Sequence, residues 1–161
     1  MIVVSDTSPL RALQALGRLG LIESVFGEAL IPPAVMRELA AESPGVAPLD
    51  VTQYPYLVVR SPSDRGQVDR LLVELNAGEA EALALAIEVG AETILLDESD
   101  GRRVAARLGL RTTGVLALLV RAKELRLLDR VEPLLDELDA KINFRVSQQV
   151  RRRVLADAGE L

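Results

Sequence analysis

The sequence contains no cysteine and no histidine, and aromatic residues make up only 2% of it. These absences exclude disulfides, thiol nucleophiles, thiolate or imidazole zinc sites, Ser-His-Asp triads and histidine general bases. Any catalysis by this chain must therefore use carboxylates, hydroxyls, amides, arginine or lysine. The scarcity of aromatic rings also means that the hydrophobic core must be aliphatic.

Long apolar segments are missing as well. No uncharged run exceeds nine residues, so no segment is long enough to span a bilayer. The N-terminus lacks the basic region of a signal peptide, and the absence of cysteine is compatible with a reducing compartment. We therefore expect a cytoplasmic protein without a membrane partner.

Positive charge is in deficit, with 19 basic against 24 acidic residues and a net charge of -5. This balance argues against a nonspecific nucleic-acid coat, because phosphate neutralisation requires clustered positive charge. A nuclease is not excluded, since acids gathered around metal ions make the average charge a poor guide to the local field.

The order of predicted elements indicates an α/β protein. With 161 residues, the chain is expected to form a single domain over residues 1–161 with one core. Short apolar runs alternate with helical patterns, which predicts a parallel sheet covered by helices on both faces. The strand candidates are Ile2–Val4, Ala29–Ile31, Leu57–Val59, Thr93–Leu96 and Leu110–Thr113. The helix candidates are about Pro9–Gly17, Leu19–Phe26, Ala34–Ala41, Arg65–Leu75, Gly78–Val89, Arg102–Leu108, Val115–Glu124, Arg130–Lys141 and Val146–Ala158.

Two of the apolar strands lead directly into an acid. Asp6 follows Ile2–Val4, and Asp97 follows Thr93–Leu96. In an open parallel sheet, ligands bind at the carboxyl ends of the strands. Asp6 could instead help to cap the next helix, for which Ser8 is the expected N-cap. The same arrangement recurs 91 positions later, which favours a shared site.

Two predicted helices carry an acid on an apolar face. Glu38 lies on such a face, where a carboxylate needs a partner or a metal. Glu79 has alanine or leucine three, four and seven residues further along, although a first-turn acid can also complement the helix dipole. Glu81 and Glu88 are seven residues apart and form the expected solvent stripe. Fraying of the first turn could still bring Glu81 inward.

These four acids, from separate parts of the chain, predict one carboxylate cluster. Several carboxylates at close range cannot all stay ionised without a counter-charge, and a hard divalent cation would supply it. Oxygen-only ligation favours Mg²⁺ or Mn²⁺ over Zn²⁺. The reaction class that follows is metal-assisted hydrolysis of a phosphodiester. The spacing of the acids does not fit aspartyl phosphatases or DxD motifs, and no glycine-rich nucleotide loop is present.

Four segments in order, SDTSPL, IPPAVMREL, GEAEALALA and ILLDESDGRRVA, resemble the motifs of PIN-domain nucleases. The chain is most similar to their prokaryotic VapC-like branch of ribonuclease toxins and predicted nucleic-acid-binding proteins. The resemblance covers about Met1–Glu124. It implies a three-layer α/β/α fold with a four- to five-stranded parallel sheet, one or two Mg²⁺ or Mn²⁺ ions, and endoribonuclease activity on an RNA substrate.

Motif matching also implies the roles of individual residues. The successive acids of the site are Asp6, Glu38, Glu79 and Asp97, and those that hold metal are Asp6, Glu79 and Asp97. Ser8 matches a small hydroxyl residue beside the first ligand. Glu81 competes with Glu79 for the third position, which is often aspartate in the toxins. Glu98 and Asp100 are possible substitutes for Asp97, because the usual Thr-x-Asp pattern is absent.

The leading hypothesis is a metal-dependent ribonuclease that forms the toxin half of a toxin-antitoxin pair, with a small antitoxin protein as partner. The alternative is a noncatalytic PIN-like module that binds RNA or protein. A third reading is a plain α/β scaffold whose acids are caps and surface charges.

Two further expectations concern the C-terminal third. Its leucines exceed what one sheet face needs, which predicts an exposed aliphatic surface and a homodimer; these are Leu116, Leu118, Leu119, Leu125, Leu127 and Leu128. The final helix and the residue before it carry four arginines, which favour a solvated basic face over a nucleic-acid clamp; these are Arg145, Arg151, Arg152 and Arg153.

Overall fold

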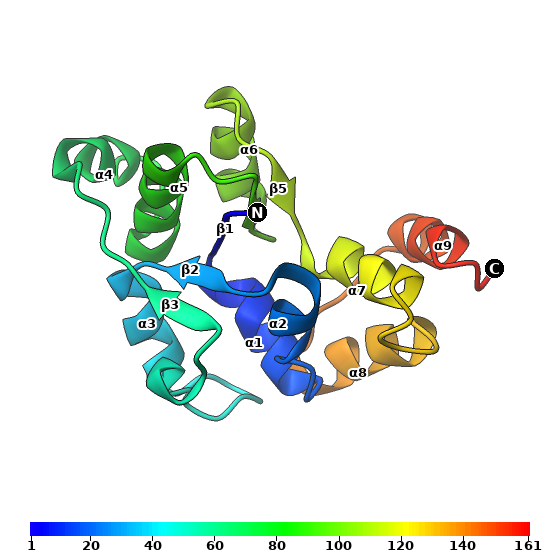
Figure 1. Ribbon diagram of the computed structural model, residues 1–161. Helices are drawn as coiled ribbons and strands as arrows, with labels where there is room; N and C mark the ends of the chain where they lie inside the picture. The colour runs from blue at the N-terminus through cyan, green and yellow to red at the C-terminus, as the bar shows by residue number, and fades with distance from the viewer.

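The computed structural model describes residues 1–161 and contains one five-stranded sheet (Figure 1). All neighbouring strands are parallel, in the order β3-β2-β1-β4-β5. The strands are β1 (Val3–Ser5), β2 (Ala29–Ile31), β3 (Leu57–Val59), β4 (Thr93–Leu95) and β5 (Thr112–Thr113). The predicted parallel sheet is therefore confirmed, with each strand within two residues of its expected position.

Nine α-helices surround the sheet, and all of them overlap the helices expected from sequence. They are α1 (Thr7–Ala15), α2 (Leu21–Phe26), α3 (Pro33–Ala40), α4 (Arg65–Leu71), α5 (Ala77–Val89), α6 (Ser99–Arg107), α7 (Val115–Glu124), α8 (Glu132–Ile142) and α9 (Gln148–Asp157). None of these helices combines the length and the apolar character that a membrane span requires.

The two-residue period of the strands divides the core between the two faces of the sheet. Val3 packs into the larger cluster with α1, α2, α3, α7, α8 and α9. Val4 packs into the smaller cluster with α4, α5 and α6. Both side chains are essentially inaccessible to solvent. Helices therefore cover both faces, which confirms the three-layer α/β/α architecture.

Strand β1 is the point at which the order of the sheet reverses. It pairs with β2 on one side and with β4 on the other, in the registers Val4↔Leu30 and Val4↔Ile94. A crevice forms at such a switch point, outside the carboxyl ends of the strands. Asp6 and Asp97 follow these two neighbouring strands, so the fold brings them to the same edge.

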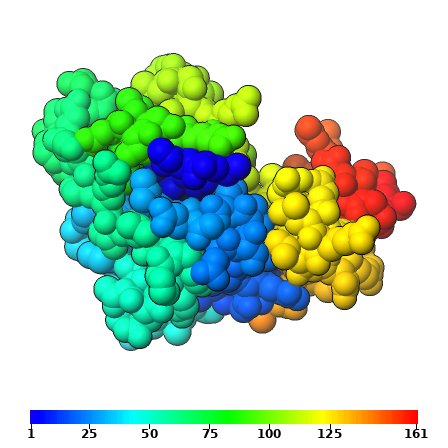
Figure 2. Space-filling model, in the orientation of Figure 1, coloured from blue at the N-terminus to red at the C-terminus, as the bar shows by residue number.

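The C-terminal helices α7, α8 and α9 lie together at one side of the sheet, coloured yellow to red in Figures 1 and 2. Helix α7 and the turn that follows it contain the six leucines expected to form an exposed aliphatic surface. Leu118, Leu119 and Leu128 are buried in the larger cluster. Only Leu125 and Leu127 are exposed, at 40% and 37%. The expectation of a broad aliphatic surface is wrong, because α8 and α9 cover α7 within the same chain.

Candidate active site

Asp6 lies at the edge where β1 passes into α1. Its backbone is held by a hydrogen bond from its amide to the carbonyl of Leu95, at 3.0 Å. Helix α1 begins at Thr7, so Asp6 rather than Ser8 occupies the N-cap position. The Asp6 side chain nevertheless makes no capping hydrogen bond and is only 3% exposed. Helix capping therefore does not explain this buried carboxylate.

The surroundings of Asp6 oppose its ionisation. Burial is the main cause, and the neighbouring carboxylates Glu79, Glu38 and Glu98 add to it. The nearby Thr7 amide, at the first position of α1, acts in the opposite direction. The net effect raises the pKa of Asp6 from 3.8 to about 7. A cation in this region would offset both the desolvation of the ionised Asp6 carboxylate and its repulsion by the neighbouring carboxylates.

Glu38 reaches the site from α3 and is half-buried. Its Oε2 atom accepts a hydrogen bond from the Thr7 hydroxyl, and its backbone carbonyl accepts one from Arg11. The carboxylate lies against the backbone of Gly78, where an added Cβ would come within 2.7 Å of Oε1. Only glycine leaves room for the carboxylate here, so α5 is shaped to receive the side chain of α3.

Glu79 is the third acid and is 6% exposed. It shares a capping box with Asn76: its amide donates to Asn76 Oδ1 at 2.9 Å, and its Oε1 accepts from the Asn76 amide at 3.3 Å. Its other oxygen lies beside Gly101 of α6, where a Cβ would be 2.9 Å away. Burial is the largest cause that raises the pKa of Glu79, followed by repulsion from Glu98, Asp100 and Glu38.

Glu81 serves a different purpose, and its assignment to the solvent stripe is wrong. The side chain is 5% exposed, accepts a hydrogen bond from the Ala34 amide at 2.9 Å and pairs with Arg65 at 3.3 Å. It therefore ties α5 to the first turn of α3 and to α4. Glu88 is exposed as expected.

Asp97 occupies the end of β4 beside the start of α7. Its Oδ1 atom accepts a hydrogen bond from the Val115 amide at 3.0 Å, and it lies so close to Gly114 that a Cβ there would be 2.7 Å away. Its Oδ2 atom is buried without any hydrogen-bond partner. Burial raises the pKa of Asp97, although the Val115 amide and Arg102 partly oppose the shift. A buried carboxylate oxygen with no donor is costly unless a ligand satisfies it.

Glu98 and Ser8 connect the two strand ends. The Ser8 hydroxyl donates to Glu98 Oε1 at 3.0 Å, and Glu98 adds negative potential at Asp6, Glu79 and Asp97. Asp100 is more peripheral, because its carboxylate is 74% exposed and lies 3.5 Å from Arg103. Glu98 therefore contributes more to the site than its prediction as a possible substitute for Asp97 suggested.

A cavity of about 630 Å³, hereafter the cleft, is lined by Asp97, Glu98 and Ser8. The cavity is also lined by residues from two segments that are distant in sequence, the loop at residues 43–46 and the segment of residues 142–144 at the end of α8. Phe144 is one of only four aromatic side chains in the protein. The cavity offers an elongated ligand both carboxylates and an aromatic ring.

The acids converge on one edge of the sheet without surrounding a single point. Glu38 and Glu98 repel both Asp6 and Glu79, but no three acidic side chains are arranged closely enough to coordinate one ion together. The partnerless Oδ2 of Asp97 and the raised pKa of Asp6 are what a divalent cation would compensate. The donor set is entirely oxygen, as Mg²⁺ and Mn²⁺ prefer, and Mg²⁺ usually retains several waters. The residues therefore fit such an ion chemically.

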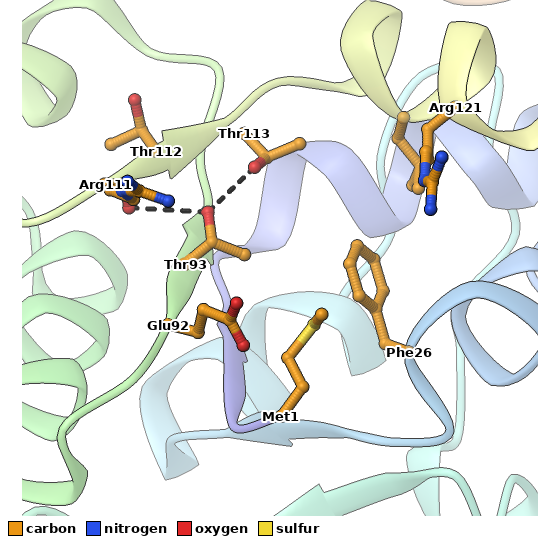
Figure 3. Close-up of a pocket in the computed structure, with 9 residues that line it drawn as sticks. Met1, Phe26, Glu92, Thr93, Arg111, Thr112, Thr113 and Arg121 are labelled. Atoms are coloured by element: carbon orange, nitrogen blue, oxygen red, sulfur yellow. Dashed lines mark hydrogen bonds between the residues drawn. The ribbon is translucent and has the colours of Figure 1, made fainter.

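A second cavity, of about 440 Å³, lies at the amino ends of the strands, on the side of the sheet opposite the acids. Figure 3 shows the hydrogen bond between Thr93 of β4 and Thr113 of β5, whose hydroxyl oxygens lie 2.8 Å apart. Glu92 is its only acidic lining residue, accompanied by Arg111 and Arg121. This cavity lacks the carboxylate set that distinguishes the first.

Four residues of the site have only weak sequence signals. Thr7 positions Glu38, yet nothing in SDTSPL distinguishes it from its neighbours. Gly78, Gly101 and Gly114 each make room for one carboxylate, and only the first adjoins a site acid in sequence. The fold, rather than any local pattern, shows which acid each glycine faces.

Comparison with known families gives one match. Residues 2–160 match the family model described as a PIN domain. The match extends beyond the segment of about Met1–Glu124 that the motifs cover and includes α8 and α9. No curated protein matches the chain.

Proposed function

The chain belongs to the PIN-domain family, whose members are generally nucleases, and we propose that it is a metal-dependent endoribonuclease that hydrolyses RNA phosphodiester bonds. The observation that carries this proposal is the Asp97 carboxylate, which is buried at a sheet edge with one oxygen unpartnered. Asp6, similarly buried on the neighbouring strand, supplies a second carboxylate whose pKa is raised to about 7. Such groups attract a divalent cation rather than stabilise the fold.

The acids have distinct roles in this proposal. Asp6 and Asp97 would hold Mg²⁺ or Mn²⁺, with Glu79 contributing directly or through water. When bound, the ion activates water and stabilises the charge that develops on the phosphate. Glu38 is kept in place by the Thr7 hydroxyl and Gly78, so it presents a fixed carboxylate to the site. Ser8 orients Glu98 at the mouth of the cleft.

The cleft favours an unpaired nucleic-acid strand. Phe144 lines the same cavity as Asp97 and Glu98, and a base freed from its stack would contact its ring there. By resemblance to the VapC-like toxins, we further propose that the chain acts in a toxin-antitoxin pair and that a small antitoxin protein controls it.

The alternative function is a noncatalytic PIN-like module that binds RNA or protein. One observation favours it: no three acidic side chains are gathered closely enough to share an ion. In that case the cleft would bind RNA without cleaving it, and added Mn²⁺ would leave the RNA intact.

Cleavage of a labelled RNA in Mn²⁺ tests the proposal. Asp6→Asn and Asp97→Asn should each reduce the rate by more than about a hundredfold, since even residues that only support metal ligands cost 10- to 100-fold when replaced. Glu88→Gln is the matched control. Glu88 is exposed, is not among the charges that shift the pKa of Asp6, Glu79 or Asp97, and accepts a hydrogen bond only from the Ser63 amide. Equal rates in all three variants would refute the assigned site.

A further inference from the structure

Asp97 also borders a third cavity, of about 430 Å³. This cavity lies between α6, α7 and α9, and its charged lining residues besides Asp97 are Arg102, Arg153 and Asp157. The apolar part of the wall includes Leu116 of α7 and Val150 of α9. Asp97 is the one residue that lines both this cavity and the cleft. The two cavities therefore meet at the strand-end acid.

Arg102 lies next to Asp97 without pairing to it. A Cβ on Gly114 would lie 2.7 Å from Asp97 Oδ1 and 3.3 Å from a terminal nitrogen of Arg102, so both groups approach the same point. The guanidinium helps to lower the pKa of Asp97 by its charge. The Asp97 side chain accepts its only hydrogen bond from the Val115 amide. The Arg102 guanidinium forms no ion pair or hydrogen bond, whereas its neighbour Arg103 pairs with Glu74 and Asp100. The guanidinium donors of Arg102 are free to bind a ligand.

Arg153 faces the cavity from α9. It has no ion-pair partner, although the carboxylate of Asp157 lines the same cavity one turn further along the helix. Its neighbour Arg151 instead pairs with Asp136 at 3.0 Å and approaches Glu132 at 3.9 Å, and so binds α9 to α8. The basic helix thus contains one structural arginine and one arginine directed at the cavity beside Asp97. The expected solvated basic face thus holds for Arg153, which is exposed, but not for Arg151, which is half-buried and ion-paired.

We propose that Arg102 and Arg153 together bind a phosphate of the RNA strand adjacent to the phosphodiester that is cleaved, an inference that rests on the proposed ribonuclease function. Two guanidinium groups present planar pairs of donors that match phosphate oxygens. The apolar wall at Leu116 and Val150 accommodates the attached nucleoside. A strand would pass from the Phe144 side of the cleft, across Asp97, to the arginine pair. Helix α9 is then part of the substrate-binding surface.

Binding of a fluorescein-labelled single-stranded RNA, measured by anisotropy across a salt series, tests this assignment. All variants are made in the Asp6→Asn background and measured in Mg²⁺, so that the RNA stays intact. Arg102→Ala and Arg153→Ala should each weaken binding about tenfold and reduce the slope of log affinity against log salt by about 0.7, the value for one lost single-strand phosphate contact. Arg152→Ala is the matched control, since it removes the same charge from the same helix but does not line the cavity.

The outcomes separate the binding site from the proposed chemistry. Unchanged affinity in both Arg102→Ala and Arg153→Ala, or an equal loss in Arg152→Ala, would overturn the phosphate site. If these two arginine variants lose affinity selectively while the wild-type chain never cleaves RNA in Mn²⁺, the phosphate site stands and the ribonuclease proposal fails. Arg153→Lys should recover part of the affinity, because it restores the charge but not the paired donors.

Discussion

The buried acids make the stability of the protein depend on pH in a definite direction. The pKa of Asp6 is raised from 3.8 to about 7, and burial raises the pKa values of Glu79 and Asp97 as well. Between these unfolded and folded pKa values, the folded protein binds more protons than the unfolded chain. The contribution of these acids to stability therefore increases as pH falls from about 7 toward about 4, by linkage. Melting temperatures in chelator should rise as pH falls from about 7 to about 5, before carboxylates with lowered pKa values such as Glu160 lose their contribution. A fall between pH 7 and pH 5 would show that burial of these acids does not destabilise the folded protein.

Removing one charge should relieve the same repulsion. Asp6→Asn should melt higher than the wild type in chelator at pH 7, because it abolishes a buried charge that Glu38, Glu79 and Glu98 oppose. Adding Mn²⁺ should reverse this order, since an ion at ten times its dissociation constant stabilises the wild type by about 1.4 kcal/mol and the variant by less. Thermal melts of both proteins check this. A lower melting temperature for Asp6→Asn in chelator, with no effect of Mn²⁺ on the wild type, would make Asp6 a structural residue.

Gly78 permits a test that separates activity from stability. In Gly78→Ala the added methyl would lie 2.7 Å from Glu38 Oε1, so the carboxylate must move away from α5. A flexible side-chain end moves at little cost, and the melting temperature should stay nearly constant. RNA cleavage should fall about tenfold or more, because a displacement of about 1 Å at a site can cost that much.

Gly66→Ala is the control, since Gly66 is also the second residue of its helix but is exposed and distant from the acids. It should retain full cleavage activity and change the melting temperature little, because the helix propensity gained is offset by a 3.3 Å approach of the new Cβ to Oδ1 of the N-cap Asp64. Equal activities in the two variants would contradict the role of Gly78.

Part of the site could be predicted from the sequence because its signal is local. Asp6 and Asp97 each follow an apolar strand, and strand ends in a parallel sheet share an edge. The choice between Glu79 and Glu81 could not be made in this way. Helical spacing shows which residues share a face, but the partners of Glu81 come from elsewhere, an amide of α3 and Arg65 of α4. The tertiary packing decides which acid is structural.

At the scale of elements, Glu160 attaches the end of the chain to the start of α8. Its side chain is 5% exposed, and its oxygens accept from the Val131 and Glu132 amides at 2.6 and 3.0 Å and from Lys123 at 3.0 Å. Burial acts to raise the pKa of Glu160, but these three donors outweigh it and hold the pKa below its usual value. The carboxylate thus fixes the position of α9 relative to α7 and α8.

Glu160→Ala should leave two helix-terminal amides unsatisfied and destabilise the protein by about 1–3 kcal/mol at neutral pH. A lowered folded pKa contributes stability that is lost as pH falls through it, so the difference between variant and wild type should shrink in acid. Thermal melts at neutral and acidic pH measure both effects. Glu124→Ala removes an exposed carboxylate of α7 that pairs only with Arg121, and it should change the melting temperature little. Equal effects of the two substitutions would contradict the attachment.

Helix boundaries show where sequence reasoning was sufficient and where it was not. Helix α7 lies at the expected Val115–Glu124, because Gly114 precedes it and its apolar periodicity is clear. Helix α6 begins at Ser99, three residues before the expected start at Arg102. The acidic run ESDG reads as a turn, but Glu98 serves as the N-cap and Gly101 is required inside the helix, where Glu79 packs against it. The packing of Glu79 against Gly101, which the sequence does not reveal, accompanies this earlier start of α6.

For the molecule as a whole, α8 and α9 are part of the larger core cluster and not an appended unit. The segment after Glu124 contributes eight residues to the larger cluster: Leu128, Val131, Leu134, Leu135, Leu138, Val154, Leu155 and Ala158. At about 1.5 kcal/mol or more for each large aliphatic side chain, their loss would exceed the net stability of a typical domain. A chain limited to residues 1–124 should therefore fail to fold, with no cooperative melt in circular dichroism. A cooperative transition in that fragment would show that the C-terminal helices are dispensable.

The sheet order also determines when Asp6 and Asp97 can come together at the carboxyl ends of β1 and β4 during protein synthesis. Strand β1 pairs with β4 in the register Val3↔Thr93, so 90 residues must be added before the central strand gains its second neighbour. Asp6, Glu38 and Glu79 are all made before Asp97, and contacts between such distant segments form late in folding. Arg153 of α9, which we propose binds phosphate, follows later still. Under the proposed ribonuclease function, the nascent chain therefore stays inactive until Asp97 has been synthesised and β4 has paired with β1.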